Sequence, residues 1–176
     1  FYNHNYESPF DSKKEKIAQL LSSKNIVKRK FTGQTSWFDV KGGQDLYVND
    51  FVYSHDDSEA QIKFENNDQI QISPNTLFQL KKHNDQIEMG LTSGSFVANF
   101  SNESGSRELT VNVQGKNIVL KPAGESKLII GVSDKGTEIT LAKGEMKING
   151  REIKVSQKVT LDGKDEKQNN WQHEHV

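Results

Sequence analysis

Hydrophobic and polar residues alternate along most of the chain from about Asn25 onward. Successive side chains of a β-strand point to opposite faces of its sheet, so a period of two predicts strands with one buried face and one solvent-facing face. Ala60, Ile62 and Phe64, for example, alternate with charged or amide residues over 59–65. Similar runs occur at 69–73, 96–100, 109–113, 128–130, 139–141, 146–148, 153–155 and 159–161.

Turn-forming residues separate these runs. Asn-Gly strongly favours a two-residue hairpin, because both residues tolerate the positive φ of a type I′ turn, and it predicts a hairpin over 146–155. About a dozen short strands connected by turns predict an all-β fold, an antiparallel-rich sandwich or roll. The turn clusters are Asn66-Asn67-Asp68, Ser104-Gly105-Ser106, Gln114-Gly115-Lys116, Asp134-Lys135-Gly136 and Asn149-Gly150.

A different spacing precedes the strands. Ser12 and Glu15 stand three residues apart, as in a capping box. Ile17, Leu20 and Leu21 then follow at helical spacing. These residues predict one short α-helix over about 12–22. No such pattern recurs later, which argues against repeated strand–helix–strand units.

The 176 residues fit one domain. We expect a lead-in and the short helix over 1–24, an all-β domain over 25–161 and a polar C-terminal tail over 162–176 that frays. Within the domain, Gly90–Phe100 and Gly144–Ile148 both place a glycine ahead of an alternating strand, a coarse internal echo. Because the chain begins with Phe1 rather than Met, we also expect a segment ahead of it, a signal peptide or a membrane anchor.

Composition narrows the range of partners. The hydrophobic fraction is 32% and the charged fraction is 27%, which suits thin sheets with one wet face. A net charge of −1 argues against binding to nucleic acid or to an anionic membrane by bulk charge, and we interpret Lys28-Arg29-Lys30 as a solvated strand or loop end. The chain has no cysteine, so it forms neither a disulfide nor a thiolate metal site.

No group of residues predicts catalysis or a bound cofactor. His173 and His175 would share one face of a strand and could hold a metal there, but no third ordered ligand is near them in sequence, so two solvated rings are the preferred interpretation. His55-Asp56-Asp57 is interpreted as a tight turn, because sequence neighbours seldom form a catalytic triad. Gly42-Gly43 is not followed by the helix pattern of a phosphate-binding loop.

Paired carboxylates are the remaining candidates for catalysis. Glu59, Glu65 and Glu88 lie on predicted strands, but their alternation places them on wet faces, where carboxylates usually serve solubility. We therefore predict no catalytic, cofactor-binding or metal-binding residue, and we predict that the protein is not an enzyme.

Five aromatic residues fall within one stretch of seventeen positions and allow two interpretations. An exposed stripe of rings would bind sugars by stacking, whereas rings at alternate strand positions would pack into a core. We favour core packing. The residues are Trp37, Phe38, Tyr47, Phe51 and Tyr53.

The order of motifs between Trp37 and Leu161 is informative. A tryptophan and a leucine precede an Asn-Asp pair, a strand follows, then a second Asn-Asp turn and a strand that ends near a proline, and Gly94 and Gly144 later precede further strands. This succession resembles the core of the FecR family. The positions that carry the resemblance, as structural motif residues, are Trp37, Leu46, Asn49, Asp50, Ala60, Phe64, Asn67, Asp68 and Pro74.

Two positions depart from the family pattern. The family's Gly-Asp is Asn49-Asp50 here, and its Asp-Gly turn is Asn67-Asp68. Asn and Asp are the next-best residues for the backbone of a turn, so the fold tolerates both replacements.

The resemblance implies a non-catalytic, periplasmic protein-interaction or sensory module, usually tethered to the inner membrane. The best-known relatives relay a signal from an outer-membrane transporter to a sigma factor through further segments, none of which is recognisable here. The expected partner is another envelope protein, contacted through a sheet face or an exposed edge strand. Contact with the membrane would come only through a segment before Phe1. A cell-wall glycan-binding module and a ligand-free envelope scaffold are the alternatives.

Overall fold

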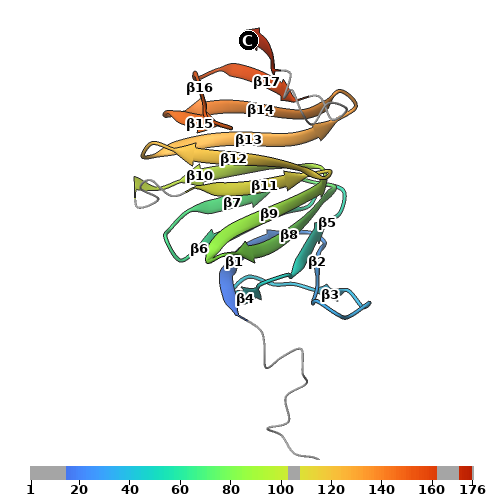
Figure 1. Ribbon diagram of the computed structural model, residues 1–176. Helices are drawn as coiled ribbons and strands as arrows, with labels where there is room; N and C mark the ends of the chain where they lie inside the picture. The colour runs from blue at the N-terminus through green and yellow to red at the C-terminus, as the bar shows by residue number, and fades with distance from the viewer. Residues whose placement is uncertain (1–14, 103–107, 162–170, 176) are drawn as a thin grey trace, which may run out of the picture.

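The protein is a sandwich of two large β-sheets. The computed structural model describes residues 15–102, 108–161 and 171–175, and these residues form eighteen strands in two nine-stranded sheets. Figure 1 shows the strands stacked from the N-terminal end of the molecule at the bottom to the C-terminal end at the top. The predicted all-β, antiparallel-rich architecture is confirmed, with more strands than the sequence indicated.

Each sheet draws its strands from the whole length of the chain. Sheet A has the order β18 (Trp171–His175), β17 (Gln157–Leu161), β14 (Gly136–Lys143), β13 (Ser126–Ser133), β10 (Ser95–Phe100), β7 (Gln69–Ile72), β6 (Glu59–Phe64), β1 (Lys16–Lys24), β4 (Gln44–Tyr47). Sheet B has the order β16 (Arg151–Ile153), β15 (Met146–Ile148), β12 (Lys116–Pro122), β11 (Leu109–Val113), β9 (Gln86–Ser93), β8 (Thr76–His83), β5 (Phe51–Ser54), β2 (Val27–Lys30), β3 (Phe38–Asp39).

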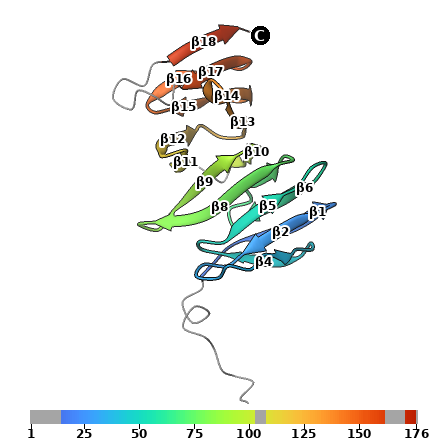
Figure 2. The ribbon, with the colours of Figure 1, turned by 90° about the vertical axis from the view of Figure 1, so that its right-hand side faces the viewer.

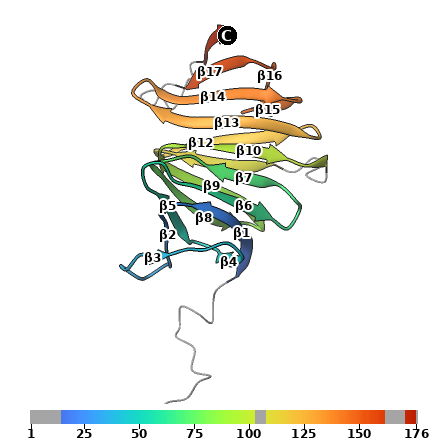
Figure 3. The ribbon, with the colours of Figure 1, turned by 180° about the vertical axis from the view of Figure 1, so that it is seen from behind.

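Successive hairpins of the chain belong alternately to the two sheets, so both sheets lengthen in the same direction along the stack. Hairpin β6–β7 lies in sheet A, β8–β9 in sheet B, β13–β14 in sheet A and β15–β16 in sheet B. Figures 2 and 3 show this progression from the side and from behind. Among the described strands, β9 and β11 form the one parallel ladder, because the chain visits sheet A through the single strand β10 between them.

The chain passes from one sheet to the other mostly on one side of the stack up to β10, and on the opposite side after β10. Most crossings up to β10 lie where Ser54 of β5 pairs with Thr76 of β8, which we name the first side. After β10 the crossings lie on the opposite, second side, where Phe100 pairs with Ser126 and Pro122 with Met146. The two sheets are thus linked on different sides in the two halves of the molecule.

The core lies between the sheets and follows the predicted alternation. On β6, Ala60, Ile62 and Phe64 are buried while the residues between them face solvent. Phe78 of sheet B and Phe96 of sheet A are fully buried, and their rings meet edge to face with centroids 5.5 Å apart. Full burial of one such side chain stabilises the fold by about 1.5–3 kcal/mol, so contacts of this kind hold the sheets together.

The helix predicted over 12–22 is wrong for the residues that the structure describes. Lys16–Lys24 is strand β1, which pairs with β4 on one side and with β6 on the other. Leu20 is fully buried whereas Leu21 is 37% exposed, so they lie on opposite faces and not on one helical stripe. A register shift between Lys16 and Ala18 leaves two neighbouring apolar residues buried, and this bulge imitates helical spacing.

Two other predictions about local structure have clear outcomes. The hairpin over 146–155 is confirmed as β15–β16, with positive φ at Asn149 and Gly150. The tail over 162–176 was expected to fray, but Trp171–His175 forms strand β18 and pairs antiparallel with β17. The alternation of apolar residues on β17 continues the sheet, and β18 supplies its next strand.

The two similar glycine-led segments at Gly94 and Gly144 have the same role in the structure. Gly94 carries the chain from sheet B to sheet A, and Gly144 carries it from sheet A to sheet B. Each has a φ of +86°, and a Cβ added at Gly94 would lie 2.6 Å from the carbonyl oxygen of Asn75. At Gly144 the nearest side-chain atom to an added Cβ is that of Ser126, at 2.7 Å. Two tight crossings of the same kind therefore join the sheets.

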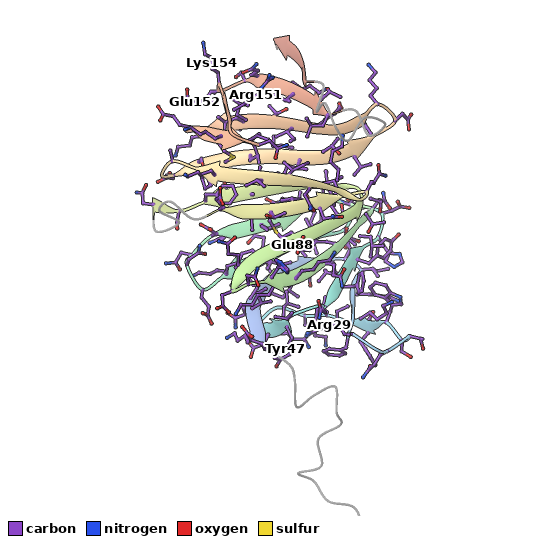
Figure 4. The ribbon with its side chains drawn as sticks, in the orientation of Figure 1. Arg29, Tyr47, Glu88, Arg151, Glu152 and Lys154 are labelled. Atoms are coloured by element: carbon purple, nitrogen blue, oxygen red, sulfur yellow. The ribbon has the colours of Figure 1, made fainter. Side chains whose placement is uncertain are left out.

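The C-terminal end of sheet B carries charge along its edge. Edge strand β16 exposes Arg151 and Glu152, and exposed Lys154 follows it, as Figure 4 shows. Charged side chains on an edge strand disfavour pairing with a further strand. Among the residues that the structure describes, no helix has the length and apolar character of a membrane span.

Candidate binding surface

A row of rings lies on the outer face of sheet B near its N-terminal end. The ring of Trp37 contacts Phe51 and Tyr53, with centroids 6.5 Å and 6.2 Å apart, and Tyr53 contacts His55 at 4.9 Å. The Nζ atom of Lys30 lies 4.9 Å from the centroid of Phe51 and 5.4 Å from that of Trp37. We name these five residues, Lys30, Trp37, Phe51, Tyr53 and His55, the aromatic surface.

Strand alternation explains why these rings point outward. On β5, Val52 and Ser54 are fully buried, so Phe51 and Tyr53 must take the other face. Lys30 of β2 is the register partner of Phe51, which places its ammonium group over that ring. A lysine held against ring faces contributes about 0.5–1 kcal/mol at an exposed site.

Core packing, the interpretation that we favoured for the aromatic stretch, is wrong. None of its five members belongs to the buried core, and Trp37 and Phe38 are 38% and 45% exposed. Phe51, Tyr53 and Tyr47 are half-buried. Alternation correctly indicated that Phe51 and Tyr53 share a face, but it did not say which face meets the other sheet.

Lys30 is the member of this surface that the sequence analysis missed. It was interpreted as part of a solvated basic run, yet only Lys28 and Lys30 of that run face outward, since Arg29 is buried. The sequence could have indicated its position. In a strand over Val27–Lys30, Lys30 and Arg29 lie on opposite faces, so a buried Arg29 leaves Lys30 facing outward.

Behind the aromatic surface, a buried ion pair closes the N-terminal end of the sandwich. The guanidinium group of Arg29 donates to the carboxylate of Asp50, and their side chains are only 7% and 2% exposed. The same carboxylate accepts a hydrogen bond from the backbone N–H of Tyr47 at 2.9 Å. Arg29 also lies 4.5 Å from the ring centroid of Phe31 and 5.8 Å from that of Tyr47. Figure 4 shows Arg29 and Tyr47 at this end.

The first motif pair, Asn49-Asp50, makes this closure possible. Asn49 has a φ of 74°, a conformation in which glycine is the least strained residue, and its N–H donates to the carbonyl of Leu80 at 2.7 Å. The N–H of Leu80 in turn donates to the carbonyl of Asp50 at 3.0 Å. This pair of backbone hydrogen bonds fixes the crossing from β4 to β5 and directs the Asp50 carboxylate inward.

The second motif pair anchors the β6–β7 turn to the end of β10. The Asp68 carboxylate accepts a hydrogen bond from the backbone N–H of Ser101 at 2.8 Å and another from the Asn66 side chain at 2.7 Å. The positive φ of this turn, 70°, is at Asn67. The residue equivalent to a turn glycine is therefore the first of the Asn67-Asp68 pair and not the second.

This assignment leads to a test on turn stability. Asn67→Gly should change the free energy of unfolding by less than about 0.5 kcal/mol, because glycine relieves strain in the folded turn while loosening the unfolded chain. Asp68→Gly should lower it by about 2 kcal/mol, because the half-buried Ser101 N–H and the Asn66 side chain both lose their acceptor. Urea denaturation of both variants measures the two values. A larger loss for Asn67→Gly than for Asp68→Gly would contradict the assignment.

The other motif positions serve packing and chain direction. Leu46, Ala60 and Phe64 are buried in the core. Pro74 is exposed in the crossing from β7 to β8, and its carbonyl accepts a hydrogen bond from the Thr76 hydroxyl at 3.2 Å. Trp37 alone of the nine lies on the aromatic surface.

The residues weighed for catalysis lie apart. His55-Asp56-Asp57 is a tight crossing turn, as predicted, in which the Ser58 hydroxyl donates to the carbonyl of Asp56 at 2.9 Å. Glu59 begins β6 and Glu65 follows its other end, whereas Glu88 stands on β9 of sheet B, as Figure 4 shows. Over 15–102 and 108–161, no three His, Asp or Glu side chains gather as they would around a metal ion.

Comparison with known proteins adds one finding. Residues 50–147 match the family model described as FecR protein, which covers just over half of the 176 residues. The match begins at Asp50, in the buried ion pair, and ends on β15, so it spans both tight glycine crossings. No curated protein matches the chain.

Proposed function

Since the chain belongs to the FecR family, a family of regulatory and signalling modules, we propose that it is a non-catalytic envelope module that binds a partner protein through the aromatic surface. The proposal places the module in the periplasm, attached to the inner membrane through a segment of the full-length protein. The observation that carries it is the row of outward-facing rings beside Lys30, of which Trp37 is the most exposed.

Such a row has the chemistry of a protein-binding hot spot. Trp and Tyr are enriched among the few residues that dominate binding energy, because they bury a large area and lose few rotamers on binding. Trp37 and Tyr53 contact each other and are backed by the closed end of the sandwich, so a partner would meet a preorganised surface. Lys30 would add a positive charge to the contact.

The test is a pull-down from native envelope extract with the domain and two variants. Trp37→Ala should weaken capture of a specific partner at least about ten-fold, since hot-spot truncations cost 2 kcal/mol or more. Ile129→Ala is the matched control, because Ile129 is 39% exposed on β13 of sheet A, away from the aromatic surface. A partner that binds wild type and Trp37→Ala equally would overturn the assignment of the surface.

A cell-wall glycan is the second candidate for the same surface. The observation in its favour is that the rings form one row facing outward, with Trp37 exposed and Tyr53 half-buried beside it, as in a sugar platform. Sedimentation with purified peptidoglycan separates the two candidates. Protein that pellets with peptidoglycan, and stays in the supernatant as Trp37→Ala, would favour the glycan; wild-type protein that never pellets would exclude it.

A further inference from the structure

A cavity of about 570 Å³ opens between the two sheets on the second side of the stack. Its position follows from the topology. On that side the chain crosses between the sheets at 48–50 and next between β10 and β11. Among the residues that the structure describes, the start of β1 and the hairpin turns at 65–68 and 84–85 border the gap between these crossings.

Both sheets line the cavity, with an apolar floor and a polar, charged rim. Phe64, Ile70 and Phe100 of sheet A are buried at its floor. Ile87 and Leu109 of sheet B are half-buried hydrophobic residues that pack against the core, and Pro122 lies beside them. Ligand sites usually measure about 300–1,000 Å³, so this cavity has the size of a small-molecule site, and its apolar floor beneath a charged rim suits an amphipathic molecule.

One part of its rim carries an excess of negative charge. The ammonium group of Lys82 donates to the carboxylate of Glu15 and lies 3.9 Å from that of Asp85. The pKa of Lys82 is raised above its ordinary value, first by the hydrogen bond to Glu15, with desolvation acting against it and the charges of Glu15, Asp85 and Glu65 adding to it. Glu65 lines the cavity as well, so this part of the rim carries three carboxylates and the one ammonium group of Lys82, a net negative charge.

The remaining lysines of the rim do not reverse this balance. Lys16 lies 3.2 Å from Asp45, which neutralises it. Lys121 lines the cavity from β12, and Glu108 lines it from the residue before β11. The acidic part of the rim is therefore the point where a cation would be attracted.

We propose that this cavity binds a small cationic amphiphile, with its apolar chain between the sheets and its positive head beside Glu15, Glu65 and Asp85. This site is separate from the aromatic surface and does not depend on the proposed function. An apolar chain would cover Ile87 and Leu109, which are only half-buried now. A carboxylate head would meet like charges at the same part of the rim, so the site discriminates by the sign of the head group.

The experiment is calorimetric titration of the full chain with decyltrimethylammonium and with decanoate, both below micelle-forming concentrations. The cationic probe should bind at least about five-fold more tightly, the effect of roughly 1 kcal/mol between charges near a protein surface. Ile87→Trp, which places a bulky ring in the opening, should weaken binding about ten-fold. Circular dichroism and the melting temperature report whether that variant keeps its fold.

The charge assignment has its own matched pair of variants. Glu65→Gln should reduce the preference for the cationic probe about two-fold or more, whereas Glu59→Gln, on the first side at the other end of β6, should leave it unchanged. Equal binding of the two probes would overturn the assignment of the head group. Absence of binding, or binding that a folded Ile87→Trp variant retains in full, would overturn the site.

Discussion

Replacing Gly94 by alanine is expected to lower the free energy of unfolding by about 4 kcal/mol, through strain at a positive φ and through overpacking. The residue has a φ of +86°, and an added Cβ would meet the Thr76 hydroxyl as well as the carbonyl oxygen of Asn75 at 2.6 Å. The Asn75 oxygen and the Cα atom of Thr76, also 2.6 Å away, belong to the backbone and cannot rotate away. The hydroxyl also accepts the N–H of Ser95 and donates to its carbonyl, both at 3.1 Å, so a shift would disturb two hydrogen bonds.

Gly115→Ala is the control that separates the two contributions. Gly115 has nearly the same φ, +82°, but nothing lies within 4 Å of an added Cβ. Alanine there should lower the free energy of unfolding by about 1–2 kcal/mol, the cost of a positive φ at a residue with a Cβ. Chemical denaturation of both variants gives their free energies of unfolding, and we expect Gly94→Ala to be less stable than Gly115→Ala by at least about 2 kcal/mol. Its melting temperature should be lower by several degrees. Equal losses would mean that the crossing at Gly94 relaxes freely.

Alternation was a reliable guide to strands because it records a local property. Ile62 and Phe64 face the core and Lys63 does not, whatever the neighbouring strands are. Pairing is a property of distant segments, and no local pattern contains it. The sequence indicates hairpins such as β15–β16 directly, but it does not indicate that β10 alone enters sheet A between two visits to sheet B.

Two of the wrong interpretations have different physical causes. At Lys16–Ala18 a bulge shifts the phase of the alternation, and the resulting spacing of apolar residues matches a helix. At Phe51 and Tyr53 the phase is right, but apolar residues occupy both faces of β5, so the pattern does not say which face is inside. In the structure Val52 faces the core, where its register partner Phe78 is also buried, and Phe51 and Tyr53 face outward.

Asp50→Asn should lower the free energy of unfolding by about 3 kcal/mol, because it leaves the charge of Arg29 buried without a counter-charge. Arg29 and Asp50 are 7% and 2% exposed at the side chain, so water cannot replace the lost partner. The Nε atom of Arg29 already lacks an acceptor within the part of the chain that the structure describes. Denaturation in urea measures the loss, and Asp45→Asn, in an exposed pair whose side chains are 47% and 42% accessible, should cost less than about 1 kcal/mol.

A double variant shows whether the pair acts through charge or through shape. Arg29→Met combined with Asp50→Asn removes both charges and keeps much of the volume, so it should recover at least about 1 kcal/mol relative to Asp50→Asn alone. Recovery would identify the cost as that of an unpaired buried cation. If the double variant is less stable than either single variant, the packing of Arg29 against Phe31 and Tyr47 is the larger contribution. In both cases loss of this closure should loosen β2 and β5, on which Lys30, Phe51 and Tyr53 stand, and so weaken partner binding along with stability.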